Sequence, residues 1–197
     1  FSIACVMATL LLVNAASGAR TVKPFQNGDR VAFIGDSITA WGAYAYVVSA
    51  FYQTRFPDRK IHWGYFGRSG ATAEFWSREA DPQDPHPEWA NLEQVLAFRP
   101  TVATIMLGMN DSGYDNIWFL PEAQKGPALA EVKAKYEKNM DLLIARLQAA
   151  GVKRIILIIS SPYDETQVTD TKPKPLIGKN AFMRDVFGDY LIRKSKE

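Results

Sequence analysis

Residues 31–39 read Val-Ala-Phe-Ile-Gly-Asp-Ser-Ile-Thr, and this stretch indicates the fold class and a candidate site. The apolar run from Val31 to Ile34 is typical of a buried strand. A polar turn follows and leads into a helical pattern near Ala40. The hydroxyl of Ser37 is therefore expected where the carboxyl end of a strand meets the N-terminus of a helix. Ligands bind at that edge of open α/β sheets, and a helix N-terminus favours negative charge.

Two further predicted strands end in turns of the same kind. Residues 61–66 lead into a turn that begins at Gly67, and residues 101–107 lead into a turn that contains Asn110. The carboxyl ends of parallel strands meet at one edge of a sheet, so we expect the three turns to converge. Together they offer a serine hydroxyl, backbone N–H groups near Gly67 and the amide of Asn110. These are the components of an acyl-transfer site, a nucleophile with oxyanion donors.

In this combination the chain resembles the SGNH hydrolases, also called GDSL esterases and lipases. The resemblance depends on Gly35-Asp36-Ser37-Ile38-Thr39, on Gly67 and on Gly108-Met109-Asn110-Asp111, in the family's order. It covers the chain from about Asp29 onward. It implies that Ser37 is the catalytic nucleophile. It also implies that the oxyanion hole consists of the Ser37 and Gly67 backbone N–H groups and the Asn110 side-chain amide.

The chain departs from the family in one respect. The family's fourth block, an Asp-x-x-His near the C-terminus, supplies the catalytic base, and no Asp-x-x-His occurs in this sequence. His62 begins a predicted strand and His86 lies in a proline-rich loop, so we expect neither histidine to act as the base. We interpret the chain as truncated before that block. The chain that ends at Glu197 is then expected to be inactive and to lack the last strand and helix of the fold.

Strands and helices alternate along the chain, which predicts an α/β fold. The expected architecture is a three-layer α/β/α arrangement around a parallel, flavodoxin-like sheet. Helices are predicted over about 39–55, about 127–150 and 178–197, and a fourth strand over 154–160. Two proline-containing stretches are expected to form rim loops above the site, at 81–87 and 161–175.

Each polar side chain at the three turns also has an ordinary structural role. Asp, Ser and Thr cap helices, and asparagine is common in turns. We expect Asp36 to bond the N–H groups of its own turn rather than to act as a triad acid. Aromatic residues near the turns form either a platform for substrate or ordinary core packing; they are Trp41, Tyr65, Phe75, Trp76, Tyr114 and Trp118.

Composition narrows the range of functions. The 197 residues carry a net charge of +2 with both signs interspersed, so neither nucleic acid nor an anionic membrane is an expected partner. No cluster of His, Cys, Asp and Glu has metal-ligand spacing, and we expect no metal or other cofactor. The sequence lacks a Gly-x-Ser-x-Gly elbow and a phosphate-binding glycine loop, which argues against that type of α/β-hydrolase and against nucleotide binding.

The N-terminal residues are predicted to be a signal peptide. The apolar stretch from Ile3 to Val13 is too short to span a bilayer comfortably, and Ser17 and Ala19 are small residues at the positions that a signal peptidase reads. We expect residues 1–19 to be a signal peptide clipped at its N-terminus. Residues 20–197 would form one hydrolase domain, incomplete at its C-terminus. The protein is then expected to be exported, periplasmic or extracellular, with no stable membrane anchor.

The sequence thus predicts a serine esterase that hydrolyses carboxylic esters through an acyl-enzyme. Acetylated carbohydrate is favoured over lipid as its substrate. The alternative is a non-catalytic protein of the same fold, which lacks the base and binds a carbohydrate or an acyl group.

Overall fold

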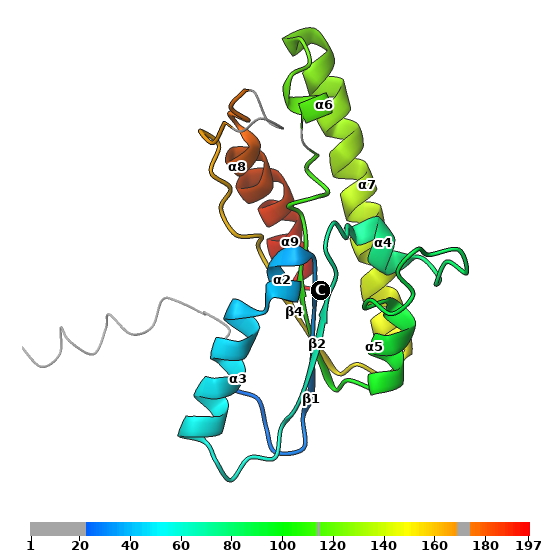
Figure 1. Cartoon of the computed structure of the whole chain (residues 1–197), viewed down its shortest axis with the longest axis vertical. Coiled ribbons are helices and arrows are strands. Elements are labelled where there is room, and N and C mark those ends of the chain that lie inside the picture. Colours follow the sequence, from blue (N-terminus) through cyan, green and yellow to red (C-terminus); the bar gives the residue numbers. More distant parts are fainter. Residues whose placement is uncertain (1–22, 114, 169–173) are drawn as a thin grey trace, which may run out of the picture.

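A computed structural model of the chain describes residues 23–113, 115–168 and 174–197 (Figure 1). The predicted signal peptide, Tyr114 and part of the predicted 161–175 loop lie outside these residues. In chain order the elements are β1 (Arg30–Gly35), α2 (Ser37–Trp41), α3 (Ala43–Arg55), β2 (His62–Gly67), α4 (Ala73–Ser77), α5 (Leu92–Phe98), β3 (Val102–Met106), α6 (Asp115–Trp118), α7 (Glu122–Ala149), β4 (Arg154–Ile158), α8 (Lys179–Ala181), the π-helical segment η1 (Phe182–Phe187) and α9 (Gly188–Lys194).

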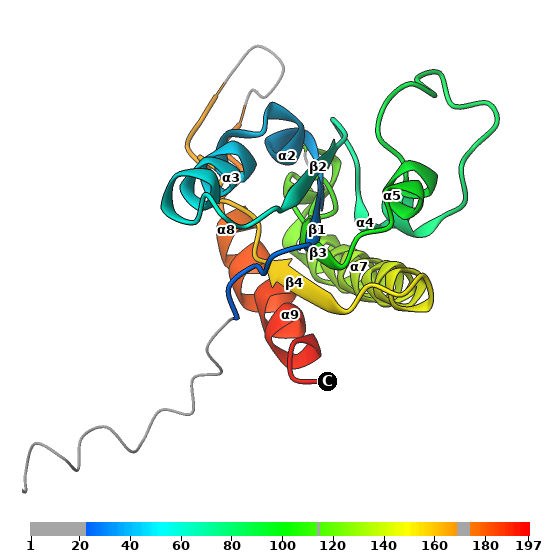
Figure 2. The ribbon, with the colours of Figure 1, turned by 90° about the horizontal axis from the view of Figure 1, so that it is seen from below.

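The described strands form one parallel sheet in the order β2-β1-β3-β4. This order matches the first four strands of the flavodoxin-like arrangement. Helices cover both faces of the sheet, with α3 on one face and α4, α5 and α7 on the other (Figure 2). The predicted three-layer α/β/α fold with a parallel sheet is therefore confirmed. In the register of the sheet, Gly35 at the end of β1 pairs with Gly67 of β2 and with Met106 of β3.

Alternate side chains of β1 enter two separate hydrophobic cores. Val31 and Phe33 pack on the side of α3, whereas Ala32 and Ile34 pack on the side of α4, α5 and α7. All four are almost fully buried, as expected for a central strand of a parallel sheet. The core on the side of α4, α5 and α7 is completed by the buried face of α7, which includes the fully buried Leu143.

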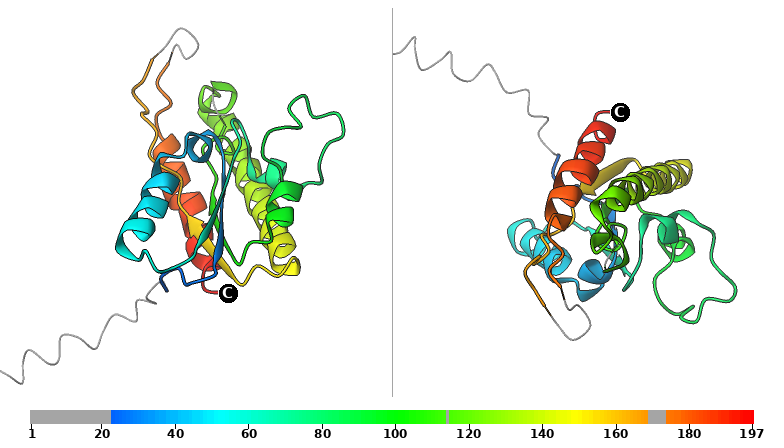
Figure 3. Two further views of the ribbon diagram at one scale, coloured as in Figure 1. Left: turned by 60° about the horizontal axis from the view of Figure 1, so that its bottom comes forward. Right: turned by 90° about the horizontal axis from the view of Figure 1, so that it is seen from above.

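The C-terminal segment packs beside α7 and reaches the turn after β3. The Phe187 ring of η1 stacks on Tyr136 of α7, with ring centroids 3.9 Å apart. A Cβ atom added at Gly108, just after β3, would lie 3.1 Å from the Phe187 ring. The chain between β4 and α8 and the segment between α4 and α5 both extend away from the sheet (Figure 3). Within the described residues, no helix combines the length and hydropathy that a membrane crossing requires.

The predicted bounds of two helices are wrong, and a third helix is irregular. The helix predicted over 39–55 is two helices, because Gly42 adopts a φ of +76° and interrupts the helical path. The long helix begins at Glu122 rather than near Pro127, which lies in its second turn and costs it one backbone hydrogen bond. The helix predicted over 178–197 contains a π-helical segment in its middle. Gly151, just after the C-terminus of α7, adopts the left-handed conformation with a φ of +87°.

The contrast between Leu143 and Leu142 tests the packing of α7. Leu143 is fully buried, whereas its neighbour Leu142 is 46% exposed. Leu143→Ala leaves a cavity in the core and should lower the free energy of unfolding by about 2–5 kcal/mol. Leu142→Ala should change it by about 0.5 kcal/mol or less. Urea denaturation followed by circular dichroism measures both, and equal losses would contradict the assigned face of the helix.

Candidate active site

Ser37 is the first residue of α2 and lies at the carboxyl edge of the sheet. Asp36 caps this helix, since its Oδ1 accepts a hydrogen bond from the Ile38 N–H at 2.9 Å. The Asp36 side chain is buried, and this burial raises its pKa although the Ile38 N–H opposes the shift. Asp36 therefore has the structural role in its turn that the sequence predicts.

Gly67 brings the turn after β2 directly against α2. A Cβ atom placed on Gly67 would lie 2.0 Å from the Ala40 nitrogen and 2.4 Å from its Cα, so only glycine permits this approach. The next residue, Arg68, donates its backbone N–H to the Gly35 carbonyl at 3.1 Å. This close backbone approach fixes the second turn beside the turn that carries Ser37.

Asn110 and Asp111 fasten the turn after β3 to the chain that follows Gly67. The Asn110 Nδ2 donates to the Ala71 carbonyl at 2.9 Å, and the Ala73 N–H donates to Asp111 Oδ1 at 2.8 Å. These neighbouring side chains thus hold the backbone on both sides of Thr72. The structure brings the three predicted turns together, because each turn is in contact with the next at one edge of the sheet.

The Asp111 carboxyl has an unusual environment. Its Oδ2 is buried and has no hydrogen-bond partner among the described residues. Burial raises the pKa of Asp111 to about 7; the Ala73 N–H opposes the shift, and the negative charge of Asp36 adds to it. Near neutral pH this carboxyl therefore carries a proton in a large share of the molecules.

Arg68, a residue that no sequence pattern singles out, anchors the loop between α4 and α5 next to Gly67. Its guanidinium is buried, forms an ion pair with Asp84 at 2.6 Å and lies over the rings of Phe75 and Trp89. The hydrogen bond from Arg68 lowers the pKa of Asp84. The position of Arg68 directly after Gly67 is visible in the sequence, but its pairing with a residue 16 positions away is not.

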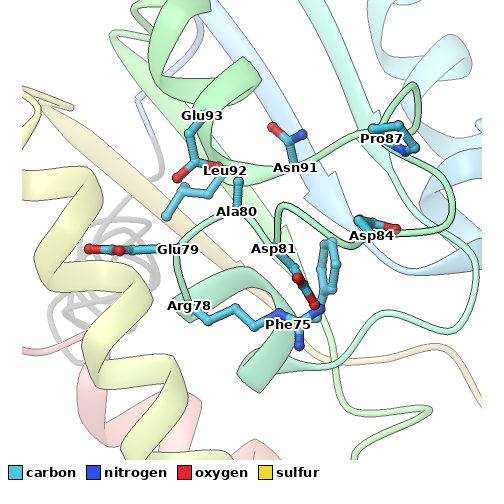
Figure 4. A pocket seen from close by; sticks show the side chains of 10 residues that line it. All are labelled: Phe75, Arg78, Glu79, Ala80, Asp81, Asp84, Pro87, Asn91, Leu92 and Glu93. Carbon is cyan, nitrogen blue, oxygen red and sulfur yellow. The ribbon is translucent and has the colours of Figure 1, made fainter.

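Cavities lie on both sides of the three turns. The cavity beneath the anchored loop is lined by Phe75, Asp84 and their neighbours (Figure 4) and measures about 80 Å³, too small for an ester substrate. A hollow of about 240 Å³ adjoins Gly67, and one of about 230 Å³ adjoins Asn110. Of the three spaces next to the turns, the hollows beside Gly67 and Asn110 are therefore the candidate binding spaces.

A family model of GDSL-like lipases and acylhydrolases matches residues 33–187. The chain belongs to this family. The match contains the turns that carry Ser37, Gly67 and Asn110, so the GDSL-like domain and the candidate site coincide. The description of this family names lipases and acylhydrolases.

Solved structures of similar fold agree with this assignment. BT4096, a gut microbial diltiazem-metabolizing enzyme, is 29% identical with a TM-score of 0.70, over 90% of this chain and 38% of that chain. This chain thus spans well under half the length of BT4096. LAE5, an alpha/beta hydrolase enzyme from the metagenome of Lake Arreo in Spain, is 26% identical with a TM-score of 0.57, over 87% of this chain and 74% of that chain.

A third structure shows likeness of fold alone. It is a catalytic mutant of Axe2, an acetylxylan esterase from Geobacillus stearothermophilus, at 23% identity and a TM-score of 0.58, over 88% of this chain and 74% of that chain. No curated protein matches the sequence.

Neither histidine of this GDSL-family chain is joined to Ser37 by a hydrogen bond within the described residues. His62 begins β2, at the opposite edge of the sheet from Gly67, and a strand of this length separates the two by about 17 Å. The His86 ring stacks on Trp89 with centroids 4.0 Å apart, and its Nδ1 faces Glu88 at 3.5 Å.

The aromatic residues near the turns divide into two groups. Trp76 and Trp118 belong to the interior, and their indole N–H groups donate to the carbonyls of Gly35 and Ser112. Trp41, in contrast, is 84% exposed at the end of α2. Of the described side chains, no group of three or more His, Cys, Asp or Glu is arranged to hold a metal ion.

Gly67→Ala should disrupt the junction of β2 with α2. The added Cβ meets backbone atoms of Ala40 that have no room to move, so we expect a loss of about 1–3 kcal/mol in unfolding free energy. Gly126→Ala is the matched control, because that glycine lies in α7 with open space around it. The control should stabilise the protein by up to about 1 kcal/mol. Thermal melts of both variants decide the point, and a neutral Gly67→Ala would contradict the close approach.

Asp111→Asn should change how stability depends on pH. A carboxyl whose pKa is raised on folding binds more protons in the native state, so wild-type stability falls as pH rises from about 4 toward 7. The amide does not titrate and escapes this loss. The melting temperature of Asp111→Asn minus that of the wild type should therefore increase between pH 5 and pH 8. A difference that stays constant over this range would show that Asp111 titrates normally.

Proposed function

We propose that the protein hydrolyses carboxylic esters by acyl transfer through Ser37. The observation that carries this proposal is the mutual anchoring of the three turns: Gly67 against α2, and Asn110 on the carbonyl of Ala71. A site of this kind holds a nucleophile and hydrogen-bond donors in one rigid arrangement, as acyl transfer requires. The family match is independent support for ester hydrolysis.

In the proposed mechanism the Ser37 Oγ attacks the ester carbonyl carbon, and a base accepts the serine proton. The negative charge on the carbonyl oxygen is stabilised by the backbone N–H groups of Ser37 and Gly67 and by the Asn110 amide. The C–O bond to the alcohol then breaks, and the alcohol takes the proton from the base. Water attacks the acyl-enzyme in the same way and releases the acid. By resemblance to the family, the base is a histidine of an Asp-x-x-His block.

The hydrogen bond from Asn110 to Ala71 supports the oxyanion role. The bond to the Ala71 carbonyl fixes the plane of the whole Asn110 amide group. A donor fixed before the reaction needs no reorganisation as charge develops in the transition state.

We further propose an acetylated carbohydrate as the substrate. The hollows beside Gly67 and Asn110, of about 240 and 230 Å³, suit a small acyl group. The exposed indole of Trp41 at the end of α2 offers a face on which a sugar ring can stack. Export, predicted from residues 1–19, is consistent with a polymeric substrate outside the cell.

Ser37→Ala should abolish turnover of p-nitrophenyl acetate by the complete product of the gene, including any sequence encoded beyond Glu197. The fold should survive, with a stability change of about 1 kcal/mol or less.

Asn110→Ala should lower kcat by roughly 10²–10³ with a smaller effect on KM, because the amide acts mainly in the transition state. Ser195→Ala, at the end of α9, is the control and should keep full activity.

Near wild-type turnover in Ser37→Ala would remove Ser37 as the nucleophile. An effect of Asn110→Ala confined to KM would assign that residue to substrate binding instead. If the complete protein binds an acetylated sugar but does not hydrolyse it, the non-catalytic binding protein becomes the better description.

A further inference from the structure

Lys179, the first residue of α8, is completely buried, with 0% of its surface exposed. A lysine is almost never fully buried unless its charge is paired or hydrogen-bonded. Its Nζ donates to the Met109 carbonyl at 3.1 Å and to the Gly113 carbonyl, and it lies 5.1 Å from the centre of the Tyr163 ring. The Met109 carbonyl precedes Asn110 and the Gly113 carbonyl follows it in the chain. The ammonium group therefore holds the base of the turn that contains Asn110.

The other hydrogen bonds to carbonyls of this turn come from groups close in sequence. The Ser112 hydroxyl also donates to Met109, the Gly113 N–H donates to Asn110, and the Trp118 indole donates to Ser112. Lys179 differs from these donors because it comes from a segment about 70 residues further along the chain. A bond from a charged donor is also stronger than one between neutral groups.

The segment that presents Lys179 is itself well anchored. Leu176 is fully buried and its carbonyl accepts from the Lys179 N–H at 3.2 Å. Gly178 adopts a φ of +96°, which turns the chain so that the lysine enters the interior. The neighbouring Asn180 bonds both the N–H and the carbonyl of Tyr163 through its side chain. The position of Lys179 is thus determined by the chain between β4 and α8.

We infer that Lys179 is a positioning residue, which orients the Asn110 amide and couples the segment after β4 to the proposed oxyanion hole. The tip of the turn is held by hydrogen bonds of the Asn110 and Asp111 side chains to the backbone of residues 71–73. Its base is held by the Lys179 ammonium group. Loss of the ammonium group leaves the Gly113 carbonyl without this donor and the Met109 carbonyl with the Ser112 hydroxyl, so we expect the turn to shift or admit water. The catalytic part of this inference rests on the proposed function, whereas the structural part does not.

Lys179→Met tests the structural part with the chain as it stands. In protein labelled with ¹⁵N-asparagine, the Asn110 side-chain amide signal is identified by its loss in Asn110→Ala. We expect hydrogen exchange of this amide to be at least about 10-fold faster in Lys179→Met, as its bond to Ala71 opens more often. Lys133→Met, at a half-exposed lysine of α7, is the control and should leave the signal unchanged.

An unchanged Asn110 signal and exchange rate in a folded Lys179→Met protein would overturn the inference. If that variant does not fold, Lys179→Gln replaces it, because glutamine fills part of the same space but its uncharged amide ends one bond short of the lysine nitrogen and holds the two carbonyls less strongly. An unchanged Asn110 amide in Lys179→Gln would then overturn the inference equally.

A double-mutant cycle in the complete gene product tests the catalytic part. Lys179→Met should lower kcat by about 10- to 100-fold with little change in KM, as expected for a misplaced transition-state donor. In the Asn110→Ala background it should have no further effect on kcat. Losses that multiply would show that Lys179 does not act through Asn110. If Asn110→Ala alone leaves kcat unchanged, the oxyanion role proposed for Asn110 fails, while the exchange experiment still decides whether Lys179 orients the turn.

Discussion

The direct backbone contact between Gly67 and Ala40 is the constraint on which the candidate site depends. Because Gly67 has no side chain, β2 can end with its backbone against α2, and the turn that carries Ser37 is held against the next turn. The parallel register places Gly35 level with both Gly67 and Met106. The three strand ends therefore present their polar turns at the same height of the sheet, and every later feature of the site is built on this alignment.

Buried polar contacts then connect the turns to one another. Asn110 and Asp111 bond the backbone on both sides of Thr72, and the Trp76 indole bonds the Gly35 carbonyl from α4. Such contacts are directional, so they fix orientation as well as distance, which apolar packing alone does not do. Asp111 Oδ2 has no hydrogen-bond partner in the part of the chain that the structure describes, and this together with the raised pKa of the carboxyl is the electrostatic cost of that arrangement.

Charged side chains from distant segments secure the rim of the site. Arg68, paired with Asp84, anchors the loop between α4 and α5 beside Gly67. Lys179 reaches from the start of α8 into the turn after β3. Both are buried cations with defined acceptors, and each joins a loop to a turn of the site. The geometry of the proposed oxyanion hole is thus linked to the segments that would surround a substrate.

The sequence by itself determined the alternation of strands and helices, the parallel sheet, the buried face of α7 and the turns that carry Ser37, Gly67 and Asn110. These features follow from local patterns of apolar residues, glycine and polar turn residues, which act over a few positions. The break at Gly42, the pairing of Arg68 with Asp84 and the buried ammonium of Lys179 were decided only by the tertiary structure. Burial and long-range pairing depend on which segments the fold brings together, and a lysine followed by an asparagine in sequence carries no sign of either.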